Sequence, residues 1–226
     1  MNQVAAALEL INRALRSKGA RLVAVSKYQT DERVMMAYDA GQRIFAENRV
    51  QELLAKKARF PSDCEWHFIG HLQSNKVRML LPAVGLIHSV DSETLLEQIN
   101  RESQRLGIVT RVLLQVHIAQ EAHKFGLKAE EVLPLLNRCA NGEFVGTRVG
   151  GLMGMASLCE DERQIGKEFS GLSALFSDAK DLYGARLADF KELSMGMSGD
   201  YPIALQYGST MIRLGSGVFQ PDDAQQ

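Results

Sequence analysis

The sequence predicts an α/β fold, a (β/α)8 TIM barrel formed by residues 1–226 as a single domain. Short apolar runs rich in β-branched residues alternate in regular order with segments of helical hydrophobic spacing. There are eight such runs, which favours a closed parallel barrel over an open doubly wound sheet, since that sheet usually has fewer strands. No linker, repeat or low-complexity stretch divides the chain.

An amphipathic helix is predicted over residues 1–19. Its apolar residues recur at helical spacing: Val4, Leu8, Ile11 and Leu15. Gly19 can end the helix. Because no helix is predicted after the last strand, we expect this N-terminal helix to pack across the closing seam of the barrel. Residues 220–226 read as a tail.

The eight predicted strands are apolar runs that end in polar or glycine-rich residues. They span Arg21–Lys27, Arg43–Asn48, Glu65–His71, Leu86–Asp91, Arg111–Ala119, Arg148–Ala156, Glu192–Ser198 and Met211–Phe219. Helical spacing and capping residues predict the helices between them. These helices span residues 31–41, 50–60, 75–81, 92–106, 128–140, 161–183 and 202–206. Pro134 is an unusual residue for the interior of a helix.

The composition argues against several classes of protein. A net charge of −1 gives no electrostatic attraction to nucleic acid or to a membrane surface. No apolar run approaches the roughly 20 residues needed to span a bilayer, and the N-terminus does not read as a signal peptide. The cysteines have no disulfide or zinc spacing: Cys64, Cys139 and Cys159. We therefore expect a cytoplasmic protein.

The first predicted strand ends in a lysine that could carry chemistry. Pleating places Val23, Val25 and Lys27 on one face of this strand. We expect Lys27 to sit where water is scarce, because it follows a buried run. Desolvation would lower its pKa, and a neutral amine can form a Schiff base with a carbonyl. Alternatively, the lysine extends into solvent, as most lysines do.

Polar residues end most of the other predicted strands as well. In barrels the chemistry gathers at these carboxyl ends. The end residues are Lys27, Asn48, His71, Asp91, His117, Met155, Ser198, and Arg213 with Gly215. An inward arginine needs a partner, which for Arg213 could be a phosphate, an aromatic nitrogen or a carboxylate such as Asp91. His67 and His71 resemble a metal pair, but on a strand they lie too far apart for one ion to be expected.

The last two strands end in glycine- and serine-rich stretches, SMGMSGD over residues 194–200 and YGSTMIRLGSG over 207–217. In a barrel, backbone N–H groups and serine hydroxyls at these positions commonly bind a phosphate. The glycines could instead serve only to make tight turns. A Schiff-base lysine on the first strand and a phosphate site on the neighbouring last two strands specify a ligand of pyridoxal-phosphate size.

Seven motifs carry a resemblance to a known family. They are AVSK (24–27), FAENRVQE (45–52), WHFIGHLQSNK (66–76), SVDS (89–92), LMGM (152–155), SMGMSGD (194–200) and GSTMIRLG (208–215). Over almost its whole length the chain resembles the pyridoxal-phosphate homeostasis protein family. The resemblance implies the barrel of the fold-type III pyridoxal 5′-phosphate (PLP) enzymes, similar to the N-terminal domain of alanine racemase.

The resemblance also implies the site residues. The Schiff-base lysine falls on Lys27, and the arginine near the cofactor ring falls on Arg213. Asn48 matches an asparagine at the end of the second strand. The implied phosphate-binding residues are Ser194, Gly196, Ser198, Gly215 and Ser216. Two departures stand out, because Ala46 replaces a glycine and His117 replaces an asparagine.

Three functions remain open at this point. The first is PLP homeostasis, in which Lys27 holds the cofactor without a defined turnover and apo PLP-enzymes are possible acceptors. The second is a monomeric PLP-dependent amino-acid racemase or lyase. The third is a class I aldolase-like barrel. We favour the first, because we expect no C-terminal domain of the racemase type in this chain, and an arginine that faces the ring nitrogen would disfavour carbanion chemistry. We expect a monomer. Lys124 could relay cofactor at the barrel mouth, although a solvated loop lysine is the simpler interpretation.

Overall fold

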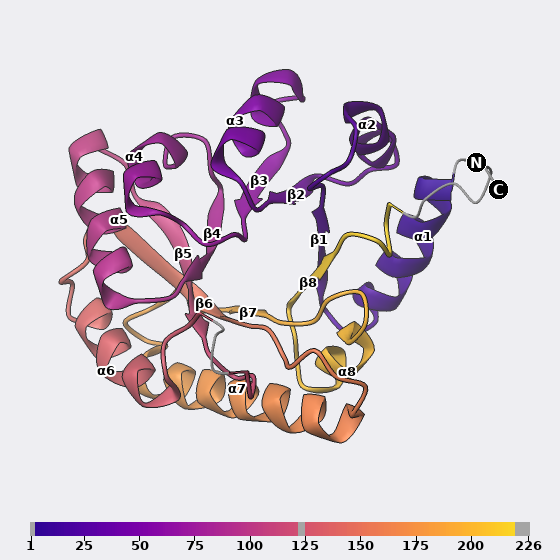
Figure 1. Ribbon diagram of the computed structural model, residues 1–226. Helices are drawn as coiled ribbons and strands as arrows, with labels where there is room; N and C mark the ends of the chain where they lie inside the picture. The colour runs from indigo at the N-terminus through magenta and orange to yellow at the C-terminus, as the bar shows by residue number, and fades with distance from the viewer. Residues whose placement is uncertain (1–2, 122–124, 220–226) are drawn as a thin grey trace.

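The computed structural model describes residues 3–121 and 125–219, and it confirms the closed barrel. Eight parallel strands pair in chain order, and β1 pairs with β8 to close the ring. Figure 1 shows the strands as an inner ring with the helices outside it. The strands are β1 (Arg21–Val25), β2 (Ile44–Glu47), β3 (Glu65–Phe68), β4 (Leu86–Val90), β5 (Thr110–Val116), β6 (Thr147–Gly154), β7 (Glu192–Ser194) and β8 (Met211–Leu214).

The helices follow the strands as the sequence predicts. They are α1 (Gln3–Arg16), α2 (Asp31–Asp39), α3 (Val50–Arg59), α4 (Val77–Leu80), α5 (Glu93–Leu106), α6 (Ala129–Ala140), α7 (Glu162–Tyr183) and α8 (Tyr201–Gln206), and a 3-10 turn, Ser74–Lys76, precedes α4. The helix α6 continues through Pro134, which is exposed on its surface. No helix within residues 3–121 and 125–219 is long and apolar enough to cross a membrane.

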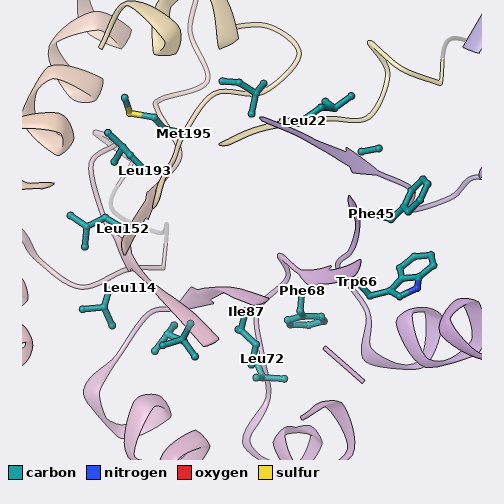
Figure 2. Packing of buried hydrophobic residues seen from close by; sticks show 14 of the residues in the cluster. Leu22, Phe45, Trp66, Phe68, Leu72, Ile87, Leu114, Leu152, Leu193 and Met195 are labelled. Atoms are coloured by element: carbon teal, nitrogen blue, oxygen red, sulfur yellow. The ribbon is translucent and has the colours of Figure 1, made fainter. Parts of the chain in front are cut away.

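The hydrophobic core forms two layers, because strand side chains alternate between the two faces of the sheet. The larger layer lies between the sheet and the helices, and Figure 2 shows its side chains pointing outward from the strands. Trp66 packs there, with its ring centroid 5.5 Å from that of Phe45 and 5.6 Å from that of Phe60. The smaller layer fills the barrel with Val23, Val25, Ala46, Leu86, Leu113, Met153 and Met211.

The N-terminal helix packs at the closing seam, as predicted. Figure 1 shows α1 beside α2, outside the edge where β1 meets β8. Leu8 and Leu15 on its inner face are almost fully buried, each with 1% of its surface exposed. The helix therefore covers the position that a helix after β8 would occupy.

Several strands are shorter than predicted. β1 ends at Val25 instead of Lys27, and β8 ends at Leu214 instead of Phe219. The chain turns at both places, because Gln29 N–H bonds to the Ser26 carbonyl and Phe219 N–H bonds to the Gly215 carbonyl. The same shortening ends β3 at Phe68, β6 at Gly154 and β7 at Ser194. The polar residues that end the predicted strands therefore lie on loops at the rim of the barrel.

Candidate functional site

A cavity of about 450 Å³ opens at the carboxyl ends of the strands. This is where barrels carry their chemistry, and the volume suits a small ligand. The cavity brings together six of the eight site residues expected from the sequence: Lys27, Asn48, Ser198, Arg213, Gly215 and Ser216. Its remaining lining residues are Val25, Ile69, Gly70, Met153, Met155, Met197 and Gly199.

Lys27 lies two residues beyond the end of β1 and lines this cavity. Its side chain is exposed, which agrees with the alternative of a solvent-facing lysine and not with a position where water is scarce. The reason is that the strand ends at Val25, and the chain has reached the rim by Lys27. The next residue, Tyr28, has φ of 65°. A bulky residue with positive φ is uncommon, and such outliers cluster at functional sites. The Lys27 Nζ lies 5.9 Å from the centre of the Tyr28 ring.

Asn48 forms the next part of the wall, after β2. Its side-chain Oδ1 is buried and has no hydrogen-bond partner in the part of the chain that the structure describes. An unpaired buried acceptor is costly, so this atom is suited to accept a hydrogen bond from a ligand. Gly70 allows this wall to form, because a Cβ there would lie 2.1 Å from the Asn48 carbonyl oxygen. Gly70 was not predicted from the sequence as a site residue.

The loops after β7 and β8 meet at the other side of the cavity. The Ser216 hydroxyl donates a hydrogen bond to the Ser198 hydroxyl over 3.1 Å. Within the described ranges, the backbone N–H groups of Ser198, Gly199, Ser216 and Gly217 make no hydrogen bond. Unpaired N–H groups and hydroxyls on two adjoining loops are the groups that bind a phosphate.

Arg213 lies on the inward face of β8 and is almost fully buried, with 3% of its surface exposed. Its guanidinium donates hydrogen bonds to the Ser194 carbonyl (2.8 Å), the Ser194 hydroxyl (2.6 Å) and the Gly154 carbonyl (3.1 Å). Burial lowers the pKa of Arg213 to about 10, against the opposing charge of Asp200. The arginine therefore remains a cation at neutral pH. Asp91, the carboxylate suggested as its partner, lies 3.1 Å from His71 instead.

Ser194 and Gly196 lie below the cavity rather than in its lining. Ser194 is fully buried and holds Arg213. Gly196 has φ of +97°, and its carbonyl accepts the Arg213 N–H over 3.0 Å. A Cβ at Gly196 would lie 2.7 Å from the Ala204 Cβ, so the glycine lets α8 pack against this loop. Both residues support the cavity from behind.

A buried ion pair, which the sequence analysis missed, lies behind Lys27 and Asn48. Lys56 of α3 places its Nζ 2.6 Å from Glu47 Oε1 and 2.6 Å from the Ser26 carbonyl. The Ser26 hydroxyl donates to the same Glu47 oxygen over 2.7 Å. Burial raises the pKa of Glu47, and the Lys56 and Ser26 hydrogen bonds oppose this rise. Glu47 lies in an apolar run, IFAE, and an acidic residue at such a position signals a buried partner.

The other candidates from the sequence lie apart from the cavity. His71 stacks on Phe125 with ring centroids 4.2 Å apart, and the His117 ring nitrogen lies 3.1 Å from the Glu121 carbonyl oxygen. His67 is buried inside the barrel, away from the exposed His71. Lys124 lies outside the described residues. A search of those residues for three or more clustered metal ligands finds no group.

Comparisons with known proteins agree with this geometry. Residues 1–222 match the family model for the alanine racemase N-terminal domain. The pyridoxal phosphate homeostasis protein of Schizosaccharomyces pombe is 35% identical over 212 residues, which cover 92% of this chain and 87% of the relative. The Homo sapiens protein of the same name is 39% identical over 217 residues, covering 90% of this chain and 77% of the relative.

Solved structures give the same result. PipY of Synechococcus elongatus PCC7942 is 34% identical, and the match covers 96% of this chain and 100% of that one. The TM-score is 0.89 for PipY without PLP and 0.84 for PipY with PLP bound. The fold and the motif-based resemblance therefore lead to the same group of proteins.

Proposed function

The chain belongs to the alanine racemase N-terminal domain family, and within it to the pyridoxal phosphate homeostasis proteins, and from this premise we propose that it binds PLP in the cavity at the rim of its barrel. Lys27 holds the cofactor as a Schiff base. The protein keeps free PLP low without a defined catalytic turnover.

One observation carries this proposal. Lys27 and the two loops that contain Ser198 and Ser216 line the same cavity. The amine suits an aldehyde, and the unpaired N–H groups and hydroxyls of the loops suit a phosphate. The unpaired Asn48 Oδ1 and the Arg213 cation supply an acceptor and a donor between them. The residues present therefore fit the two ends of PLP and the ring that joins them.

The bond to the cofactor follows ordinary carbonyl chemistry. Lys27 would hold the cofactor through its amine, because an amine that has given up its proton can condense with an aldehyde to form a C=N bond and release one water. Bound PLP supplies a ring that can withdraw electrons. Because Arg213 keeps its proton at neutral pH, it would donate a hydrogen bond to a ring nitrogen without protonating it. The ring then withdraws electrons weakly, which supports a role in holding the cofactor rather than in turnover.

The test is a visible spectrum of the purified holoprotein before and after borohydride reduction, with the modified peptide located. We expect an absorbance band that borohydride abolishes, and a reduced adduct on Lys27. In Lys27→Ala the band should be absent, whereas the control Lys76→Ala should keep it. A colourless protein that forms a reducible adduct only with a simple carbonyl compound would support the aldolase-like alternative. A full band in Lys27→Ala would overturn the site assignment.

One feature favours the second candidate, a PLP-dependent amino-acid racemase or lyase. His71 Nδ1 lies 3.1 Å from Asp91 Oδ2 at the rim, and such a pair can act as acid and base. Both residues lie outside the lining of the cavity, which is why we rank this function second. Exchange of the α-deuterium from a panel of amino acids distinguishes this enzyme from a protein that only holds the cofactor. Fast, saturable exchange that His71→Gln abolishes would favour the enzyme.

The proposal also covers the acceptors of the cofactor, the oligomeric state and the localisation of the protein. We propose apo PLP-enzymes as acceptors of the cofactor, and a relay role for Lys124 is kept as the alternative to an ordinary loop lysine. We also propose that the protein works as a monomer in the cytoplasm, where the free thiols of Cys64, Cys139 and Cys159 would stay reduced. Transfer of PLP to an apo-enzyme by wild type and by Lys124→Ala tests the relay, and sedimentation tests the monomer. Unchanged transfer in the variant would exclude the relay.

A further inference from the structure

A line of buried polar side chains crosses the inside of the barrel beneath the cavity. Ser194 Oγ lies 3.0 Å from His88 Nδ1, and His88 Nε2 lies 2.9 Å from His67 Nδ1. His67 Nε2 in turn lies 3.0 Å from Glu65 Oε1. Arg213 begins this line at the floor of the cavity, and Glu65 ends it at the first residue of β3. Five residues on β3, β4, β7 and β8 therefore form one continuous chain of hydrogen bonds.

With both imidazoles neutral, the two ends fix the direction of every hydrogen bond. A carboxylate can only accept, so Glu65 requires a proton on His67 Nε2. A neutral His67 then accepts at Nδ1 from the Nε2–H of His88. His88 accepts at Nδ1 from the Ser194 hydroxyl, and Ser194 accepts from Arg213, which can only donate. One proton assignment thus satisfies the whole chain.

Burial is consistent with this assignment. His67 is 1% exposed and His88 is fully buried. Burial lowers the pKa of both imidazoles, which favours the neutral ring with one N–H; at His67 the contact with Glu65 opposes this shift. The hydrogen bond from His67 lowers the pKa of Glu65, which keeps that end of the chain ionised.

We infer that His88, His67 and Glu65 are positioning residues for Arg213, acting through Ser194. Three of the five guanidinium N–H groups bond to Ser194 and Gly154, and this leaves the Nε–H and one Nη2–H for a ligand in the cavity. The chain of hydrogen bonds prevents rotation of the Ser194 hydroxyl, and Ser194 in turn fixes the plane of the Arg213 guanidinium. A bound ring therefore meets a cation of fixed orientation. The contact between Arg213 and a bound ring rests on the proposed function, whereas the chain of hydrogen bonds does not.

The first experiment uses the protein without cofactor, so it tests the chain of hydrogen bonds independently of PLP. Long-range ¹H–¹⁵N spectra of the labelled protein report the tautomer of each histidine. We expect His67 and His88 to be neutral between pH 6 and 8, with the proton on Nε2 in both. A proton on Nδ1 of either ring, or a ring that becomes charged in this range, would overturn the inference.

The second experiment measures the PLP-loaded protein. In His88→Leu we expect Kd for PLP to rise by roughly 5- to 30-fold, the effect of one or two lost hydrogen bonds. The pH midpoint of the Schiff-base band should rise, because a less ordered cation opposes imine protonation less. His88→Asn should restore much of both values, since its amide oxygen replaces Nδ1 as the acceptor for Ser194.

Glu65, at the far end of the chain of hydrogen bonds, provides a graded test, and Glu192 nearby provides the control. Glu65→Gln weakens the acceptor at the amino end of β3 and should shift the band midpoint in the same direction by less. Glu192→Gln removes a carboxylate at the same end of the barrel, where Glu192 binds Arg21 and Thr210 outside the chain. It should leave the midpoint unchanged. Variants that melt at a lower temperature with an unchanged midpoint would show a purely structural role and overturn the proposal.

Discussion

Lys56 of α3 and Glu47 of β2 form an ion pair that is almost fully buried, with 7% and 0% of the two side chains exposed. The Lys56 ammonium also holds the Ser26 carbonyl, the last backbone group before Lys27. Glu47 is likewise the residue before Asn48. The pair therefore joins the ends of β1 and β2 directly behind two residues of the cavity.

The first prediction concerns this pair. Lys56→Met should lower the free energy of unfolding by about 3–5 kcal/mol, because it leaves a buried carboxylate without its cation. Urea unfolding at pH 7 measures the loss. The double variant Glu47→Gln/Lys56→Met should recover part of it.

The control for this prediction is an exposed ion pair on α1. Arg13 and Glu9 keep 75% and 60% of their side-chain surfaces exposed. Arg13→Met should therefore change the free energy of unfolding by less than about 1 kcal/mol. Equal losses in Arg13→Met and Lys56→Met would contradict the view that burial makes the Lys56 pair important.

The second prediction concerns the contact between Gly70 and Asn48. Gly70→Ala should destabilise the protein by about 1–3 kcal/mol and weaken PLP binding, because the new Cβ would overlap the Asn48 carbonyl oxygen. Thermal unfolding and PLP titration provide the two measurements. Gly171→Ala is the matched control, since a Cβ at this position in α7 meets no atom within 4 Å. It should stabilise the helix by up to about 1 kcal/mol. A Gly70→Ala protein as stable as wild type would show that the rim can move.

Much of the fold could be predicted from the sequence, because alternation of apolar strands with amphipathic helices depends on local spacing. Strand ends such as that of β1 could not, since a polar residue at the rim reads like the last residue of a strand. This error also gave the wrong environment for Lys27. The sequence grouped Lys27 with Ser198 and Ser216 correctly, because carboxyl ends of parallel strands share one rim.

The inner part of the site was harder to predict. Whether Ser194 faces a ligand or holds Arg213 depends on which atoms face the cavity, and no sequence spacing encodes this. His88 lies in the strand sequence LIHSV, between Ile87 and Ser89, and carries no motif signal of its own. Its partners His67 and Ser194 are on other strands, so only the closed barrel brings the three together.

The third prediction concerns acid stability. Burial lowers the pKa of His67 and His88 below the ordinary value of 6.5, so the folded state binds fewer protons than the unfolded state below that pH. Their stabilisation is therefore complete above pH 6.5 and is lost as the pH falls. The slope approaches about 1.4 kcal/mol per pH unit for each histidine. The raised pKa of Glu47 acts in the opposite sense, but Glu47 is common to all the variants compared.

Urea unfolding of wild type and His88→Asn between pH 5 and 7.5 measures this effect. The variant should lose less stability than wild type over that range, because one of the two buried imidazoles is gone. Parallel curves for the two proteins would show that His88 gains its proton equally in the folded and unfolded states.

The fourth prediction separates residues that contact the phosphate from residues that hold Arg213. Ser198→Ala and Ser216→Ala should each weaken PLP binding by roughly tenfold, because each removes a hydrogen bond to a charged group. Neither change should affect binding of pyridoxal, which lacks the phosphate. Ser194→Ala should weaken both ligands alike, since Ser194 is fully buried and bonds to Arg213. Titrations of each variant with PLP and with pyridoxal make the comparison. If Ser194→Ala weakens binding of PLP alone, Ser194 contacts the phosphate, as the family resemblance implies. If Ser198→Ala and Ser216→Ala weaken binding of pyridoxal as strongly as binding of PLP, the phosphate binds elsewhere.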